Sequence, residues 1–217
     1  MSAEVLAFFD GAGRRLGSKT RDEVHRDGDW HWLVFVWCAW LRENEPVLLL
    51  QQRGRRGDPF VRSLDAPAGG HVMASESHRQ AGVREFEEEA GILLGEGDLH
   101  YLGSARLEGQ ERNCPRVIQH SYLVIREIGL EEVSFSEESD GFLHVPLKPL
   151  LRLLEGETES VEAAVRYADG AGEPGRARIT AEAFARYPPD IAAVIAKSLR
   201  AVELYLAEGR VDPLLWR

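Results

Sequence analysis

Four glutamates stand within five residues near the middle of this 217-residue chain, in the segment REFEEEAG. Residues three and four apart are neighbours on a helix, so Glu85, Glu88 and Glu89 share one arc of a helix, whereas Glu87 points elsewhere. Carboxylate oxygens are the hard ligands that Mg²⁺ prefers. The spacing therefore indicates a site for a divalent cation.

The glutamates occupy the less favourable end of their helix. Ser77 and Gln80 match a capping box and Gly91 supplies a stop, which predicts a helix from about Ser77 to Ala90. Acidic side chains in the last turns oppose the helix dipole at roughly 0.3–1 kcal/mol each, and like charges at this spacing add roughly 0.2–0.5 kcal/mol per pair. Such conflicts concentrate at functional sites, and a bound cation would reverse the local electrostatics.

A longer pattern surrounds the glutamates. Residues 70–92 read GHVMASESHRQAGVREFEEEAGI, and this segment resembles the Nudix box of the Nudix hydrolases at every defined position. The matching residues are Gly70, Glu76, Arg84, Glu85, Phe86, Glu88, Glu89, Gly91 and Ile92. The resemblance implies an α/β fold, an α/β/α sandwich on a mixed sheet, and hydrolysis of a diphosphate linkage in a nucleoside diphosphate derivative or related small molecule.

The resemblance also implies roles for single residues. Four groups would be the ligands of Mg²⁺ or Mn²⁺: Glu85, Glu88, Glu89 and the backbone carbonyl of Gly69. Arg84 and Glu76 would orient the loop and the glutamates by hydrogen bonding. The ions would neutralise the diphosphate and lower the pKa of a bound water that attacks phosphorus. For the general base, Glu85 is one choice, and Glu137 and Glu138 on a later loop are the others.

Basic side chains outside the box are candidates for substrate binding. Arg53 and Arg56, in the turn QQRGRRGD, carry guanidinium groups that can bind phosphates in bidentate fashion. His71 follows the box glycine, and His25 precedes an aromatic stretch. The alternative is that the arginines belong to an exposed basic turn without a function and that the histidines serve only the packing of the fold.

Two further passages resemble the isopentenyl-diphosphate isomerase-like branch of the superfamily: EVHRDGDWHW, and LLLQQRGRRGDPF followed by LDAPAGGHV. In true isomerases a catalytic cysteine precedes the Gly-His pair, and a second metal site combines histidines with two glutamates on a later strand. Here Gly69 stands at the cysteine position, and Gln119 and His120 stand in place of the acids. We therefore expect a hydrolase, with a prenyl-diphosphate isomerase or a non-catalytic nucleotide-sensing module as alternatives.

The composition narrows the range of partners. The formal charge of −10 does not suit long nucleic acid, whose binding draws on clustered Lys and Arg, although a small diphosphate can bind through bridging cations. Cys38 and Cys114 lack any metal or disulfide spacing, and no apolar run is long enough to span a bilayer. We expect a cytoplasmic protein without membrane contact, and a homodimer is possible.

The elements that must position the box alternate along the chain. Apolar runs punctuated by Gly, Asp and Pro predict six strands: VLAFF, WLVFVWCAWL, VLLLQQ, LHYLGSARL, VIQHSYLVI and FLHVPL. LDAPAGGHV adds a short extended piece, KPLLRLLEG a helix, and DGAGEPG a loop. From Ile179 onward the pattern predicts two helices interrupted at Pro188 and Pro189. We expect a Nudix domain over residues 1–155 and a mostly helical extension over 156–217 packed on it.

Overall fold

A computed structural model describes residues 4–54, 60–109, 116–170 and 174–216. Within these ranges one sheet has the order β11-β10-β9-β4-β3-β8-β7, with β5 beside β4 and β6 beside β3. Its strands are β3 (His31–Arg42), β4 (Glu45–Arg53), β5 (Leu64–Asp65), β6 (Ala68–His71), β7 (Leu99–Glu108), β8 (Arg116–Ile125), β9 (Ser139–Pro146), β10 (Val161–Tyr167) and β11 (Gly175–Ile179). Since β3 and β8 run parallel and the other pairs antiparallel, the sheet is mixed.

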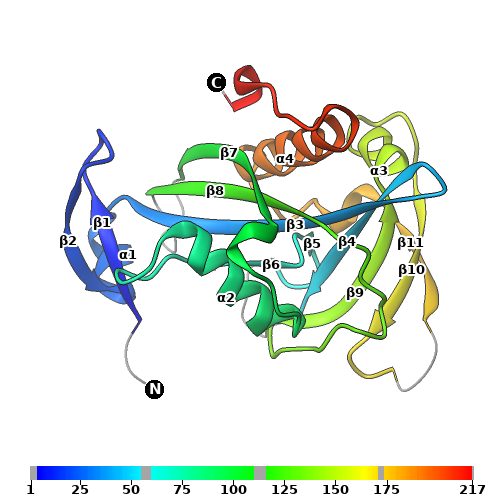
Figure 1. Ribbon diagram of the computed structural model, residues 1–217, viewed down its shortest axis with the longest axis horizontal. Coiled ribbons are helices and arrows are strands. Elements are labelled where there is room, and N and C mark those ends of the chain that lie inside the picture. Colours follow the sequence, from blue (N-terminus) through cyan, green and yellow to red (C-terminus); the bar gives the residue numbers. More distant parts are fainter. Residues whose placement is uncertain (1–3, 55–59, 110–115, 171–173, 217) are drawn as a thin grey trace.

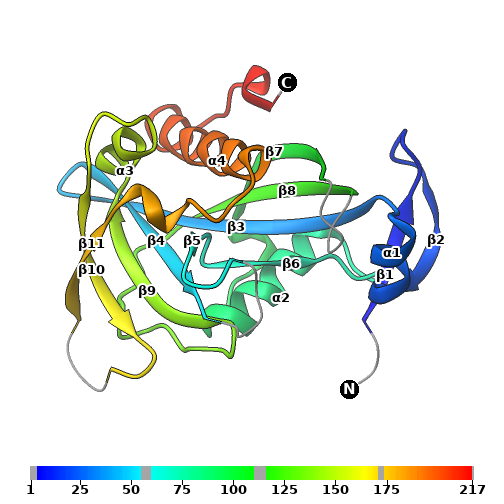
Figure 2. The same ribbon diagram turned by 180° about the vertical axis from the view of Figure 1, so that it is seen from behind.

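Helices cover both faces of this sheet, which confirms the expected α/β/α layers. Figures 1 and 2 show α2 (His78–Ala90) on one face, and α3 (Leu147–Leu154) and α4 (Pro189–Glu208) on the other. Alternate residues of β3 point to opposite faces: Val34 and Val36 pack with Phe86 of α2, and Trp37 packs with Leu199 of α4. The strand is therefore apolar on both sides.

Strands β3 and β4 pair directly only along part of their length. Beyond Cys38 and Leu49 they separate, and β5 and β6 pair with their free portions. In β6, Gly70 lies opposite Val34 and faces α2, whereas His71 lies opposite Leu33 and faces the other way. The short strand β6 thus presents residues to both faces of the sheet.

A smaller unit stands at one end of the molecule (Figure 1). It consists of β1 (Val5–Phe9), β2 (Arg15–Thr20) and α1 (Arg21–Asp27). Thr20 and Glu23 form a capping box, and Gly28 ends the helix with a φ of 69°. The apolar run of β1 was predicted, whereas β2 and α1 were not, because β2 is polar and largely exposed.

The region after residue 155 differs from the expectation in two respects. Two helices were expected after Ile179, but the first part forms only a single 3-10 turn, η2 (Ala181–Ala183), before α4. Pro188 and Pro189 explain this, since proline is accepted only in the first turn of a helix, and α4 begins there. Two short 3-10 turns lie elsewhere, η1 (Glu96–Asp98) and η3 (Pro213–Trp216).

The second difference is that the extension contains strands as well as a helix. β10 pairs with β9, and β11 pairs with β10, so the sheet continues past residue 155 without a break. Val161, Ala163 and Val165 alternate as the buried positions of β10. No helix among the described residues is long and apolar enough to cross a membrane.

Candidate active site

The helix α2 has the predicted ends. The Ser77 side chain accepts a hydrogen bond from the Gln80 backbone, and Gly91 closes the helix with a φ of 71°. Of the glutamates, Glu85 and Glu89 are buried, at 9% and 6% exposure, and face the sheet. Two carboxyl groups therefore lie under β6 in the interior of the protein, an arrangement that is costly unless a positive charge compensates.

Two strands of the sheet contact Glu89, and a third supports one of these contacts. Its carboxylate accepts hydrogen bonds from the backbone N–H of Gly69 (2.9 Å) and from Nε2 of Gln51 (3.0 Å). The same Gln51 nitrogen donates to Oγ of Ser139. Because these residues belong to β6, β4 and β9, the sheet itself fixes the position of this glutamate.

Arg84 connects the remaining acids of the box. Its guanidinium donates to Glu76 (2.7 Å), Glu85 (2.7 Å) and Glu88 (3.1 Å), and to the backbone carbonyl of His71 (3.0 Å). Glu76 in turn accepts from the backbone N–H of Met73. One arginine therefore ties the loop before α2 to the acids on the helix.

Burial controls the charge of the two inward-facing acids. It raises the pKa of Glu85 to about 7, although Arg84 acts in the opposite direction. Burial also raises the pKa of Glu89 well above its usual range, against the hydrogen bond from Gly69. A divalent cation would favour the ionised form of both groups. The donor set, hard carboxylate oxygens short of positive charge, fits Mg²⁺ or Mn²⁺.

Gly70 is required for the close approach of β6 to the glutamates. A Cβ at this position would lie 2.2 Å from Oε1 of Glu85. Any side chain would displace the carboxylate, so the first glycine of the box serves the packing of strand against helix.

The other candidates for catalysis and substrate binding fall in different places. Glu138, half-buried before β9, lies close enough for its negative charge to raise the pKa of Glu89, whereas Glu137 is exposed. The charge of Arg53, at the end of β4, acts on the same carboxyl in the opposite direction. Arg56 lies outside the described residues.

Two residues near the glutamates were missed in the sequence. Gln51 continues an apolar strand and gave no signal apart from its polarity. Glu4 precedes β1, and its pKa is raised by burial and lowered by Arg21 and Arg84. Only the folded chain brings this amino-terminal acid within electrostatic reach of the box.

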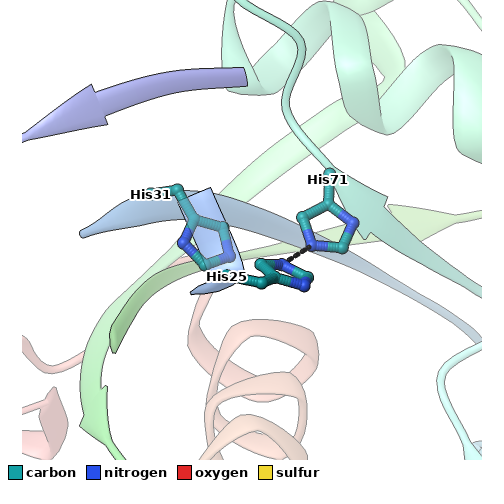
Figure 3. Close-up of side chains that lie close together, drawn as sticks. All are labelled: His25, His31 and His71. Carbon is teal, nitrogen blue, oxygen red and sulfur yellow. Dashed lines mark hydrogen bonds between the residues drawn. The ribbon is translucent and has the colours of Figure 1, made fainter. Parts of the chain in front are cut away.

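A second cluster of possible ligands consists of three histidines (Figure 3). His25 of α1, His31 of β3 and His71 of β6 place ligand nitrogens within 4.8 Å of one another. The Nε2 atoms of His25 and His71 are 3.1 Å apart. Burial lowers the pKa of His25 to about 4 and lowers that of His31 and His71 too. Neutral imidazoles are the form that binds metal ions.

The histidines and the glutamates lie on opposite faces of β6, because His71 follows Gly70 in the strand. Gln119 lies opposite Leu33 and so shares the face of His71. His120 points to the α2 face, where its ring stacks on His78 at 4.0 Å. Gln119 and His120, which were expected at the positions of the isomerase acids, therefore lie on different faces of the sheet, and neither supplies a carboxylate.

Comparisons with known proteins agree with the resemblance of residues 70–92 to the Nudix box. A family model for the NUDIX domain matches residues 31–163. An uncharacterised Nudix hydrolase of Clostridium acetobutylicum is 29% identical over 165 residues, which are 75% of this chain and 80% of that protein. Nudix hydrolase 3 of Arabidopsis thaliana is 38% identical over 95 residues, 43% of this chain but only 12% of that longer protein.

A solved structure supports the fold independently. The crystal structure of a Deinococcus radiodurans protein superposes with a TM-score of 0.54 at 19% identity, covering 70% of this chain and 90% of that one. The family match spans more than half of the chain and includes β6, α2 and the whole box. The chain therefore belongs to the Nudix family of hydrolases.

Proposed function

We propose that the protein is a Mg²⁺-dependent pyrophosphohydrolase that cleaves the diphosphate linkage of a nucleoside diphosphate derivative or a related small molecule. The observation that carries this proposal is the pair Glu85 and Glu89, buried under β6 and short of positive charge. The complete box and the names of the relatives support it.

Three carboxylates and one carbonyl would hold the ion: Glu85, Glu88, Glu89 and the carbonyl of Gly69. Bound Mg²⁺, or Mn²⁺, supplies charge neutralisation of the diphosphate and acidifies a water. The exposed position of Glu88 places one acid toward solvent, the side from which substrate and ion arrive.

Residues of the chain itself organise the reaction. Arg84 holds Glu76, Glu85 and Glu88 in a fixed arrangement, so the ligands are oriented before an ion binds. Glu138 is the candidate to accept the proton of the attacking water, because it is half-buried and its charge reaches Glu89. Glu85 is the alternative base.

The positive group assigned to the substrate is Arg53. Its guanidinium lies within electrostatic reach of Glu89 and can donate two parallel hydrogen bonds to a phosphate. We assign it to the diphosphate rather than to the leaving group, since its charge acts on the proposed ligand Glu89.

A hydrolysis panel tests this function. Nucleoside diphosphates and triphosphates, ADP-ribose, dinucleotides, coenzyme A and prenyl diphosphates would be assayed with Mg²⁺ and with Mn²⁺. We expect Glu88→Gln and Glu89→Gln each to lower kcat by about 10³-fold, the scale of removing one preorganised charged group. Glu87→Gln, an exposed neighbour on the same helix, should stay within about twofold of the native rate. Unchanged turnover in both Glu88→Gln and Glu89→Gln would disprove the mechanism.

The histidine cluster favours one second candidate, a prenyl-diphosphate isomerase. The three clustered imidazoles, of which His31 is buried and His25 and His71 are half-buried, fit part of the second metal site that the isomerase-like resemblance implies, but Gly69 provides no thiol and Gln119 no carboxylate. We rank this activity below hydrolysis for that reason. Incubation with isopentenyl diphosphate separates the two, because an isomerase would move the double bond without release of phosphate.

A further inference from the structure

A buried acid outside the Nudix box lies one strand away from the glutamates. Asp65 of β5 is 5% exposed and lies opposite Gln51, the residue that donates to Glu89. Its Oδ1 accepts from the backbone N–H of Ala66 at 2.8 Å. Its Oδ2 accepts from the hydroxyl of Tyr187 at 2.9 Å and faces Nη1 of Arg53 at 3.5 Å. Both carboxylate oxygens are therefore engaged, and the group is held in one orientation.

The backbone of Arg53 is also held by hydrogen bonds. Its N–H donates to the carbonyl of Ser63 (3.0 Å), and its carbonyl accepts from the N–H of Arg62 (2.7 Å). The guanidinium thus contacts Asp65 and also lies within reach of the charge of Glu89. A guanidinium held in this way loses little freedom when it binds a phosphate, which is the physical basis of preorganised binding.

The hydroxyl that completes this arrangement comes from a distant part of the chain. Tyr187 lies between η2 and α4, beyond residues 31–163 that match the family, and is 7% exposed. Its ring also contacts Phe60, with centroids 4.9 Å apart. The two contacts are separable: the ring packs on one segment, and the hydroxyl reaches the buried acid on another.

We propose that Asp65 and Tyr187 form a positioning pair that holds Arg53 toward the diphosphate of the substrate. Through this pair, the segment after β11 sets the affinity of the active site for diphosphates. The proposal rests on the function proposed above, since it deepens the role of Arg53. Burial raises the pKa of Asp65, and the charge of Arg53 and the Tyr187 hydroxyl act against it. Loss of the Tyr187 hydroxyl would disfavour the ionised form of Asp65, which is the form that orients the Arg53 guanidinium.

The test uses the full chain and a non-hydrolysable diphosphate, methylenediphosphonate with Mg²⁺, measured by calorimetry. Tyr187→Phe keeps the ring contact and removes only the hydroxyl, and we expect binding about tenfold weaker, the effect of one lost hydrogen bond to a charged group. Tyr205→Phe is the matched control. Its hydroxyl bonds Nδ1 of His100 at 2.9 Å, in the same carboxy-terminal region but away from the glutamates, and we expect the native affinity.

Arg53→Ala separates this proposal from the function on which it depends. If Arg53→Ala binds the diphosphonate as tightly as the native chain, the assignment of Arg53 to the diphosphate fails. If Arg53→Ala weakens binding and Tyr187→Phe does not, the positioning pair is overturned and the assignment of Arg53 stands.

Turnover and stability distinguish positioning from a purely structural role. With a substrate identified in the panel, Tyr187→Phe should raise KM about tenfold and leave kcat within about twofold. Asp65→Asn, which keeps the size of the side chain, should show the same pattern. A lower melting temperature with an unchanged KM in both variants would mean that the pair only supports the fold.

Discussion

The two faces of β6 carry opposite chemistry. Under Gly70 lie the carboxyls of Glu85 and Glu89, and on the other face His71 meets His25 and a third imidazole. Burial removes charge from both clusters, since it raises the pKa of the acids and lowers that of the histidines. The nearby charge of a cation would therefore favour the ionised, metal-binding form of the acids, whereas burial already favours the neutral, metal-binding form of the histidines.

The clusters also differ in what holds them. The acids are tied together by Arg84 and by backbone donors, so their positions are set by charged hydrogen bonds. The histidines are held by hydrogen bonds between neutral groups, between His25 and His71 and from His31 to the Asp29 carbonyl, and by ring contacts, with His31 and His71 stacked at 5.4 Å. Hard oxygen donors suit Mg²⁺ and Mn²⁺, and imidazole nitrogen suits ions such as Zn²⁺. Two faces of one strand thus offer two kinds of donor set, separated by one residue.

Replacing Arg84, the positively charged side chain among the acids, should have the largest effect on stability. Arg84→Met keeps much of the side-chain volume and leaves Glu76 and Glu85 without their charged partner. We expect the free energy of unfolding to fall by about 3 kcal/mol, as for a buried ion pair that loses one member. Urea unfolding in the presence of EDTA measures it. His31→Asn, on the other face, should cost less, and equal losses would show that the two faces are not held differently.

Adding a methyl group to one face of β6 or to the other should lower the rate of hydrolysis to different extents. In Gly70→Ala the new Cβ would displace the carboxylate of Glu85, and we expect hydrolysis about 100-fold slower, the scale of a misplacement near 1 Å. In Gly69→Ala the Cβ would point to the face opposite the acids and meet the ring of Phe35 at 2.9 Å, while the backbone groups of Gly69 assigned to Glu89 and to the ion are retained. We expect a smaller loss of rate there. Turnover of Gly70→Ala at the native rate would contradict the assignment of the acidic face to catalysis.

The smallest effect expected is on the pH dependence of stability in the absence of metal. The folded pKa of Glu85, about 7, exceeds its ordinary value of 4.5, so the stability it contributes is complete below pH 4.5 and is lost as the pH rises toward 7. The folded pKa of His25, about 4, lies below its ordinary 6.5, so its contribution is complete above pH 6.5 and is lost as the pH falls toward 4.

Variants of the two faces should change opposite ends of this profile. Glu85→Gln should remove the decline in stability between pH 4.5 and 7. His25→Asn should flatten the profile on the acid side. Urea unfolding at a series of pH values, with EDTA, gives both curves, and identical profiles for the two variants would refute the opposite electrostatics of the faces.

Local signals in the sequence were enough to predict the helix that carries the candidate site. The capping residue Ser77 and the stop at Gly91 act within one turn of the helix, and both ends of α2 are as expected. The strands with long apolar runs were also predicted, since their apolar residues alone indicate that they are buried. The family resemblance added the roles of Gly70 and Arg84, whose packing and hydrogen bonds the structure contains.

Features that depend on tertiary pairing could not be predicted in the same way. β10 reads VEAAVRY, and its buried Ala163 gives little apolar signal, so the strand is defined by β9 beside it. The histidine cluster needs β6 to pair with β3 and α1 to fold back onto both. Asp65 and Tyr187 are 122 residues apart in the chain, and nothing in either neighbourhood indicates the other.

The pairing of β9 on both sides has a consequence for shortened forms of the protein. β4 bonds one side of β9 and β10 the other. A chain cut after residue 155 would leave one side of β9 as an open edge, with unpaired backbone groups beside the apolar Leu143 and Val145. Open apolar edges recruit strands of other molecules. We expect a fragment that ends at residue 155 to aggregate, and pairing of this side of β9 requires the chain through β10.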